Sequence, residues 1–110
     1  MALTALQVGT AAPTAHITKP TANAKCQVTV TFSWQGIPTA TQASITVTDV
    51  GHGGVGEAQT AHASGKMTLV IPAVANPTTT TLNAVGKVAN IKGKTLAVAR
   101  STAKLDCVFG

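Results

Sequence analysis

Cys26-Gln-Val-Thr-Val-Thr-Phe-Ser-Trp34 is the most strictly patterned stretch of this chain. Apolar side chains recur at every second position, and Gln, Thr and Ser side chains fill the positions between them. Because the side chains of a β-strand point alternately to opposite faces, this period of two predicts a strand with one buried face. The side chains that this pattern sends into a core are Val28, Val30, Phe32 and Trp34.

Further segments repeat this alternation along the chain. Ala43–Asp49 and Lys66–Ile71 do so, and Lys104–Phe109 does so near the end. The core positions predicted there are Ile45, Val47, Leu69, Ile71 and Leu105. Shorter strands are expected around His16–Thr18, Glu57–Ala63, Thr78–Val88 and Thr95–Ser101. Strands at spacings of about ten residues, without any sustained helical period, predict an all-β fold: an antiparallel sandwich of about seven to nine short strands.

The length of 110 residues is typical of one domain with one core. We expect residues 25–110 to form the sandwich and residues 1–24 to form an N-terminal arm or an edge strand. Hydrophobic residues make up 45% of the chain, but only two Phe and one Trp are present. Val, Ile and Leu side chains must therefore build most of the core.

Two cysteines, Cys26 and Cys107, enclose most of the chain. A disulfide between them would close a long loop, which is worth about 4–5 kcal/mol in the chain-entropy model. Two buried, reduced thiols that pack as small hydrophobic side chains are an equally compatible interpretation.

The Cys-x-Val-x-Val-x-Phe-x-Trp strand and the closing strand with Cys107 together resemble an immunoglobulin-like sandwich. Met1–Gly9 carries no basic residue ahead of its apolar positions and does not read as a signal peptide. Among small sandwiches of this kind, the chain resembles phage virion accessory proteins, such as head decoration (cement) and tail proteins. The resemblance implies a non-enzymatic structural protein that binds capsid or other virion subunits. It further implies a homo-oligomer, with a trimer as the expected form, assembled in the host cytoplasm and located in the virion.

Basic residues outnumber acidic ones by eight to three, and four of them form a candidate basic patch. These four are Lys87, Lys92, Lys94 and Arg100. Nucleic-acid binders usually combine such a patch with stacking aromatic side chains or several Arg residues, whereas this sequence has one Arg and no aromatic residue at a position expected to be exposed, so a nucleic-acid partner is not expected. Lysines that protect strand edges and keep the protein soluble explain the pattern better. No apolar stretch approaches the ~18 residues of a membrane span, so no membrane partner is expected.

A glycine-rich stretch is predicted to be a loop that contacts a partner. Its residues are Gly51, His52, Gly53, Gly54, Val55 and Gly56. A phosphate-binding loop would need a helix after it and a Lys followed by Ser or Thr, and neither follows here.

Catalytic and metal-binding chemistry is not expected. His52, Glu57 and His62 are spaced five apart, so a strand would send successive members to opposite faces, and His16 lies far away in the sequence. The three acidic residues are Asp49, Glu57 and Asp106, which form no paired set, and no serine lies in a nucleophile elbow. We therefore expect neither a cofactor nor an enzyme.

The alternative hypothesis is a secreted immunoglobulin-like binding module, an adhesin or a carbohydrate-recognising domain, that forms part of a larger protein. Carbohydrate recognition would require an exposed aromatic platform. Trp34 is the only candidate, and its position in the alternating pattern places it with the core residues.

Overall fold

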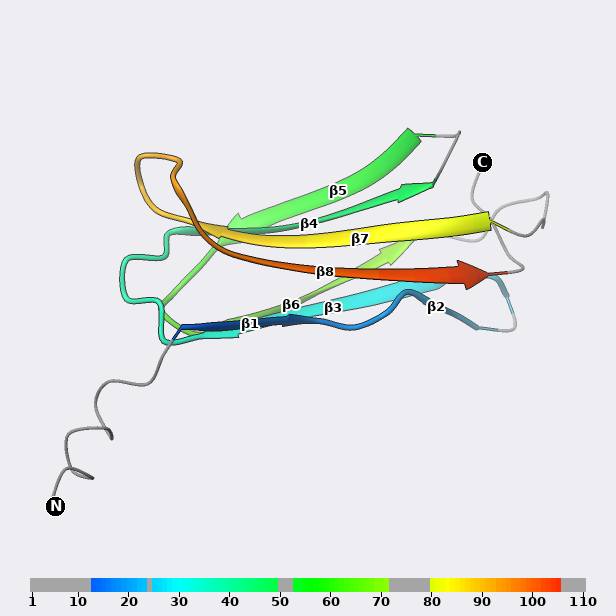
Figure 1. Ribbon diagram of the computed structural model, residues 1–110, viewed down its shortest axis with the longest axis horizontal. Coiled ribbons are helices and arrows are strands. Elements are labelled where there is room, and N and C mark those ends of the chain that lie inside the picture. The colour runs from blue at the N-terminus through cyan, green and yellow to red at the C-terminus, as the bar shows by residue number, and fades with distance from the viewer. Residues whose placement is uncertain (1–12, 24, 50–52, 72–79, 106–110) are drawn as a thin grey trace, which may run out of the picture.

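The computed structural model describes residues 13–23, 25–49, 53–71 and 80–105, and it is drawn in Figure 1. The described residues contain eight strands and no helix. The strands are β1 (Thr14–Ile17), β2 (Thr21–Ala22), β3 (Val28–Gln35), β4 (Gln42–Asp49), β5 (Gly53–Thr60), β6 (Gly65–Ile71), β7 (Thr80–Ala89) and β8 (Thr95–Leu105). All their pairings are antiparallel, which confirms the predicted all-β sandwich.

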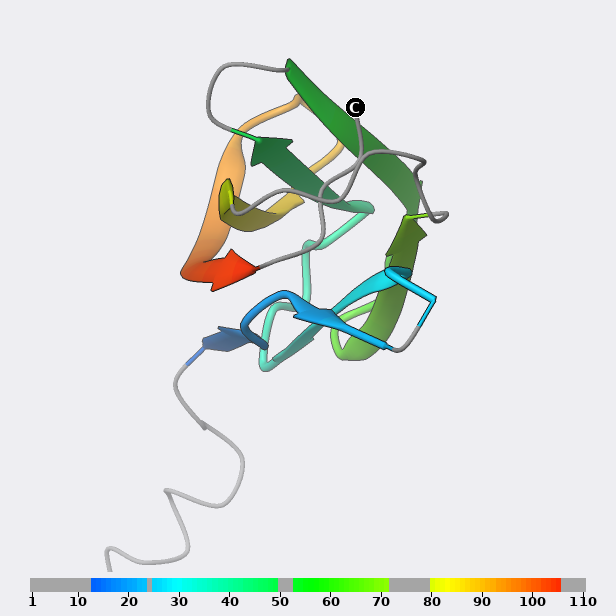
Figure 2. The same cartoon turned by 90° about the vertical axis from the view of Figure 1, so that its right-hand side faces the viewer.

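Two sheets face each other, as the view along the strands in Figure 2 shows. In the first sheet β3 is central: β6 pairs with one of its edges, while β1 and β2 share the other. The second sheet has the order β5-β4-β7-β8. The first sheet thus ends at β1 and the second at β8, and Figure 1 shows these two strands running beside each other.

The alternating strands bury the face that the sequence predicts. Val28, Val30, Phe32 and Trp34 of β3 are buried, and so are the predicted core residues of β4 and β6: Ile45, Val47, Leu69 and Ile71. Leu105 is half-buried and packs against the core. The core also contains buried side chains that were not predicted from the sequence. They are Leu82, Ala84 and Val88 of β7, together with Ile17, Ile37 and Met67.

The two largest core side chains, Phe32 and Trp34, contact each other with their rings tilted by 34° and lie against glycines. The ring centroids of Phe32 and Trp34 are 5.4 Å apart. A Cβ at Gly86 of the opposite sheet would overlap the Phe32 ring, and a Cβ at Gly65 would lie 2.6 Å from Trp34 Cζ2. The indole Nε1 of Trp34 donates a hydrogen bond to the His62 carbonyl at 2.9 Å. Each ring therefore occupies space that only a residue without a side chain leaves open.

The prediction that the glycine-rich stretch is a contact loop is wrong for four of its residues. Gly53, Gly54, Val55 and Gly56 form the start of strand β5. Gly51 and His52 lie outside the described residues. Backbone pairing with β4, from Asp49↔Gly53 onward, overrides the weak strand preference of glycine. A Cβ at Gly54 would lie 3.0 Å from the Val47 carbonyl oxygen, so glycine permits the close approach of this edge strand.

Two strand boundaries also differ from the prediction. Cys26 does not begin β3: it has a φ of 60° and lies in a turn, where its N–H donates to the Asn23 carbonyl at 2.9 Å. Asn23 Oδ1 further accepts hydrogen bonds from the N–H groups of Lys25 and Gln27, and these bonds stabilise the turn. At the other end, Ser101 and Lys104 belong to one strand, β8, because continuous pairing with β7 leaves no turn between them.

Cys26 is disulfide-bonded. The only other cysteine of the sequence, Cys107, lies outside the described residues. The presence of a bond at Cys26 rules out the interpretation of Cys26 as a free thiol, whereas its pairing with Cys107 stays a prediction. Of the expected N-terminal arm or edge strand, residues 14–17 and 21–22 form β1 and β2, and residues 1–12 lie outside the described residues.

Gly86→Ala is expected to lower the free energy of unfolding by about 1–3 kcal/mol, because the new methyl group must displace the Phe32 ring. Chemical denaturation followed by Trp34 fluorescence measures the change. Gly56→Ala is the matched control: a Cβ there would lie 3.4 Å from the nearest atom, the Ile45 carbonyl oxygen, and we expect a change below about 0.5 kcal/mol. Equal losses in both variants would contradict the packing argument.

Reduction of the disulfide is expected to lower the free energy of unfolding by about 2–5 kcal/mol. Alkylation without reductant should label neither cysteine, and alkylation after reduction should label both. If Cys26 and Cys107 pair within one chain, the Cys26→Ser, Cys107→Ser double variant should be no less stable than either single variant. A covalent dimer in non-reducing electrophoresis would show instead that the bond joins two chains.

Candidate protein-interaction site

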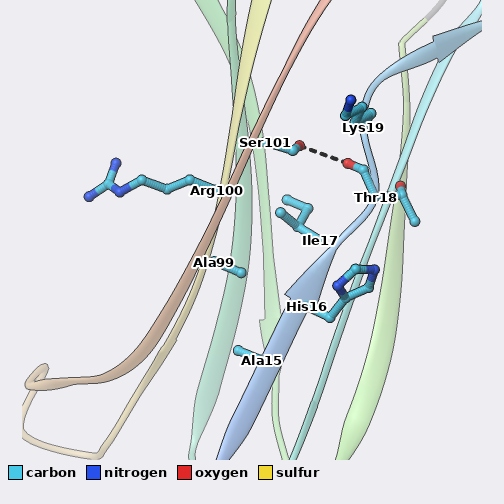
Figure 3. Close-up of a pocket in the computed structure, with 8 residues that line it drawn as sticks. All are labelled: Ala15, His16, Ile17, Thr18, Lys19, Ala99, Arg100 and Ser101. Atoms are coloured by element: carbon cyan, nitrogen blue, oxygen red, sulfur yellow. Dashed lines mark hydrogen bonds between the residues drawn. The ribbon is translucent and has the colours of Figure 1, made fainter.

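A groove runs between the edge strands of the two sheets, and we call it the β1–β8 seam. Its lining residues are Ala15, His16, Ile17, Thr18 and Lys19 from β1 and the residues after it, and Ala99, Arg100 and Ser101 from β8 (Figure 3). Its volume is about 610 Å³. Within the described residues β1 pairs only with β3 and β8 only with β7, so no ladder of backbone hydrogen bonds closes the seam.

One hydrogen bond bridges the seam between these two strands. Ser101 Oγ donates to the Thr18 carbonyl oxygen at 2.8 Å, the dashed line of Figure 3. Thr18 is held in turn by Thr31 of β3: its N–H donates to the Thr31 carbonyl at 2.9 Å, and its Oγ1 accepts from the Thr31 N–H at 2.9 Å. This Ser101–Thr18 clasp fixes one end of the seam to the first sheet.

Small side chains form the floor of the seam. From Ala97 to Leu105 of β8 the residues at odd positions are half-buried and those at even positions are exposed. Ala15 of β1 and Ala99 of β8, which line the seam, pack against the core, and so do Leu96 and Ala97 nearer the start of β8. The seam is thus a groove of mixed lining between two strand edges: Ala15, Ile17 and Ala99 are apolar, and the remaining lining residues are polar or charged.

The predicted basic patch separates into two parts. Lys87 and Arg100 lie on the exposed outer face of the second sheet, on neighbouring strands that pair as Lys87↔Val98 and Val85↔Arg100. Figure 3 shows the Arg100 side chain directed away from β1. Lys92 and Lys94 lie in the turn between β7 and β8 and are also exposed. Of the four patch residues, only Arg100 lines the seam, and its side chain points away from β1.

The turn between β7 and β8 is the expected one, and it presents an exposed apolar side chain that sequence analysis did not single out. Asn90 Oδ1 accepts hydrogen bonds from the N–H groups of Lys92, at 2.9 Å, and Lys94, at 3.0 Å. Gly93 takes a φ of 81°, and its N–H donates to the Asn90 carbonyl. Ile91 is 83% exposed at the tip. The signal in the sequence was an isoleucine inside a turn-forming Asn-x-x-Gly stretch.

The other residues considered for chemistry are dispersed. Among the described residues, no three His, Cys, Asp or Glu side chains gather where they could hold a metal ion. His16 borders the seam, His62 lies on an exposed connection, and His52 lies outside the described residues. Asp49 is buried at the end of β4, whereas Glu57 is exposed on β5 and Asp106 lies outside the described residues.

Comparison with known proteins finds no matching family model, curated protein or solved structure. In the described part of the chain there is no helix with the length and hydrophobicity of a membrane span. Function must therefore be inferred from the geometry of the sandwich and its edges.

Ser101→Ala removes the clasp, and we expect the free energy of unfolding to fall by about 0.5–1.5 kcal/mol. Because the lost bond holds β1 against β8, the backbone amides of residues 14–18 should exchange with solvent faster, as measured by hydrogen exchange with mass spectrometry. Thr102→Ala is the control, since it removes a side-chain hydrogen bond of 2.9 Å, to Asn83 Oδ1, on the outer face of the same strand. Faster exchange in β1 for both variants would contradict a specific role of the clasp.

Proposed function

We propose that this chain is a non-enzymatic structural protein of a phage virion, a head decoration (cement) protein that binds and stabilises the capsid shell. The observation that carries the proposal is the β1–β8 seam. Strand β8 has eleven residues, so its edge on the seam side is about 36 Å long. Native proteins normally cover or block long strand edges, because an uncovered edge pairs with other chains. An edge of β8 that is unpaired among the described residues and lies beside this groove is suited to a protein whose binding partner covers that edge.

The outer faces of both sheets favour a protein partner. They carry hydroxyl groups that bond to one another or to amides, as Thr31 Oγ1 does to Thr68 Oγ1 at 3.2 Å and Thr102 Oγ1 to Asn83 Oδ1. Charged residues make up only 10% of the chain. Because burying unpaired charges is costly, a hydroxyl-bearing surface with few charged side chains can be packed closely against neighbouring subunits at low desolvation cost.

The disulfide at Cys26 supports a protein that works outside a reducing cytosol, since such bonds persist in virions and secreted proteins. Because secreted proteins also keep disulfides, the secreted binding module remains the alternative hypothesis. Its carbohydrate-recognising form is disfavoured, because Trp34 is 4% exposed and its N–H is already bonded to the His62 carbonyl. Stacking on a sugar would require an accessible ring face.

The proposed mechanism is bridging between capsid subunits. An extended segment of a neighbouring virion subunit can add to an exposed strand edge through main-chain hydrogen bonds, while alternate side chains enter the groove and provide specificity. A protein that binds only the assembled shell stabilises it by mass action. Enzymatic groups are not required for this role, and the partners would be capsid or other virion subunits.

Mass spectrometry of gradient-purified particles of the source phage tests the proposal. The tryptic peptide Met67–Lys87 should be present at a copy number comparable to that of the major capsid protein. Particles that lack the protein should break open at a lower temperature, and addition of the purified protein should restore their stability. Absence of the peptide from purified particles would overturn the proposal.

Two variants connect this test to the seam. Ala99→Trp fills the groove and should weaken particle binding, whereas Thr46→Trp, on the exposed outer face of β4, should bind like the unmodified protein. Circular dichroism establishes that both variants are folded. Equal binding by both would exclude the seam as the attachment site.

A further inference from the structure

We propose that the β1–β8 seam is filled by the N-terminal segment, residues 1–12, of a second copy of the chain, so that the protein assembles into a closed homo-oligomer. This inference rests on the proposed role of the seam as a protein-binding edge. It names the occupant: a strand donated in trans, which lies along β8 between Thr95 and Ala99.

The shape of the seam selects this part of β8. The Ser101–Thr18 hydrogen bond joins the two sides of the seam, and Figure 1 shows the beginning of β8 rising away from β1. In that region β8 pairs with β7 through Ala99↔Gly86, Ala97↔Val88 and Thr95↔Ala89. Its other edge has no paired strand among the described residues. An added strand would therefore meet an available edge without breaking a β-ladder.

The floor of the seam requires an occupant with larger apolar side chains. Ala15 and Ala99 line the seam and present single methyl groups beside the core, and the half-buried Leu96 and Ala97 follow toward the start of β8. In the N-terminal segment, Leu6 and Val8 share one parity and Gln7 has the other. A strand made from this segment would place the Leu6 and Val8 side chains over the alanines and the Gln7 side chain toward solvent. The sizes of the donated side chains and of the groove are complementary.

The charge of the segment fits the same place. Residues 1–18 contain no Lys, Arg, Asp or Glu, and the first charged side chain is Lys19. The segment therefore brings no ionised side chain into the seam. The basic side chains Lys87 and Arg100 lie on the outer face, clear of the floor.

The length and connection of the segment favour donation to another copy. Twelve residues in extended form span about 40 Å, enough to leave one molecule and cover five residues of β8 in the next. Pro13 immediately precedes β1, and the residue before a proline disfavours the helical conformation used in tight turns. A reversal that returned the segment to its own seam is therefore disfavoured. Donation from each copy to the next is a heterologous contact, which closes into a ring when the rotation permits, as in a trimer.

Light scattering of the full-length protein, coupled to size-exclusion chromatography, gives the first test. The unmodified protein should have a mass that is a small multiple of 11.0 kDa. Leu6→Asp and Val8→Asp should each weaken association by about a hundredfold or more, because each replaces a buried apolar side chain with a charge. Gln7→Asp is the matched control: it adds the same charge to the same segment on the solvent side and should keep the oligomeric mass. A monomeric unmodified protein, or dissociation of all three variants alike, would overturn the inference.

Cross-linking separates donation in trans from return to the same chain. The α-amine is the only amine before Lys19, so an amine-reactive reagent reports the position of the N-terminal segment. In an equal mixture of isotope-labelled and unlabelled protein, cross-links from the α-amine to Lys94 should include pairs of mixed label. Cross-links confined to one label would overturn donation in trans.

Failure of this inference is distinguishable from failure of the proposed function. A monomer that is present in particles, and whose attachment is blocked by Ala99→Trp, would identify a capsid segment as the occupant and would leave only the proposed function standing. An oligomer that behaves as expected, from a protein absent from purified particles, would leave strand donation standing and overturn the virion role.

Discussion

The packing of Phe32 and Trp34 between two glycines is the interaction on which the sandwich is built. The two rings lie with their centroids 5.4 Å apart, with Phe32 against Gly86 of the opposite sheet and Trp34 over Gly65 of the neighbouring strand. These are the largest side chains of an otherwise aliphatic core, and they bring the two sheets together without a side chain between ring and backbone. The indole N–H bond to His62 then ties the connection between β5 and β6 to the same centre.

At the β1–β8 side of the sandwich the interior is filled differently. Instead of rings against glycines, methyl-sized side chains of β1 and β8 lie beside the core, and a single serine hydroxyl bridges the two strands. Close packing is favourable wherever large groups are available, so a groove floored by alanines marks a place where further apolar groups can be accommodated. The strand edges and the groove thus meet on one side of the molecule, and this side is where we place its partner.

The buried residues of much of the first sheet and of the centre of the second could be predicted from the alternating pattern within single strands. The alternation in β3, β4 and β6 places Val30, Ile45 and Leu69 in the core, and all three are buried. Interpretation from composition was less reliable: Gly53–Gly56 was expected to be a loop, but pairing with β4 makes it a strand. Cys26 likewise fits the alternating pattern, yet its left-handed backbone belongs to a turn stabilised by Asn23. The seam was not predicted at all, because Ala15 and Ala99 carry no motif.

There is a physical reason why the fold class could be predicted from the sequence and the seam could not. The inward or outward direction of a side chain is a local property of an extended backbone, so a period of two in the sequence was sufficient to establish the fold class and most of the central core. Which strand edges are left uncovered depends on how strands far apart in the chain come together, as Thr18 and Ser101 do across 83 positions. That distance is closed by the packing of the whole sandwich. The groove between β1 and β8, and the side of the molecule open to a partner, therefore exist only in the folded chain.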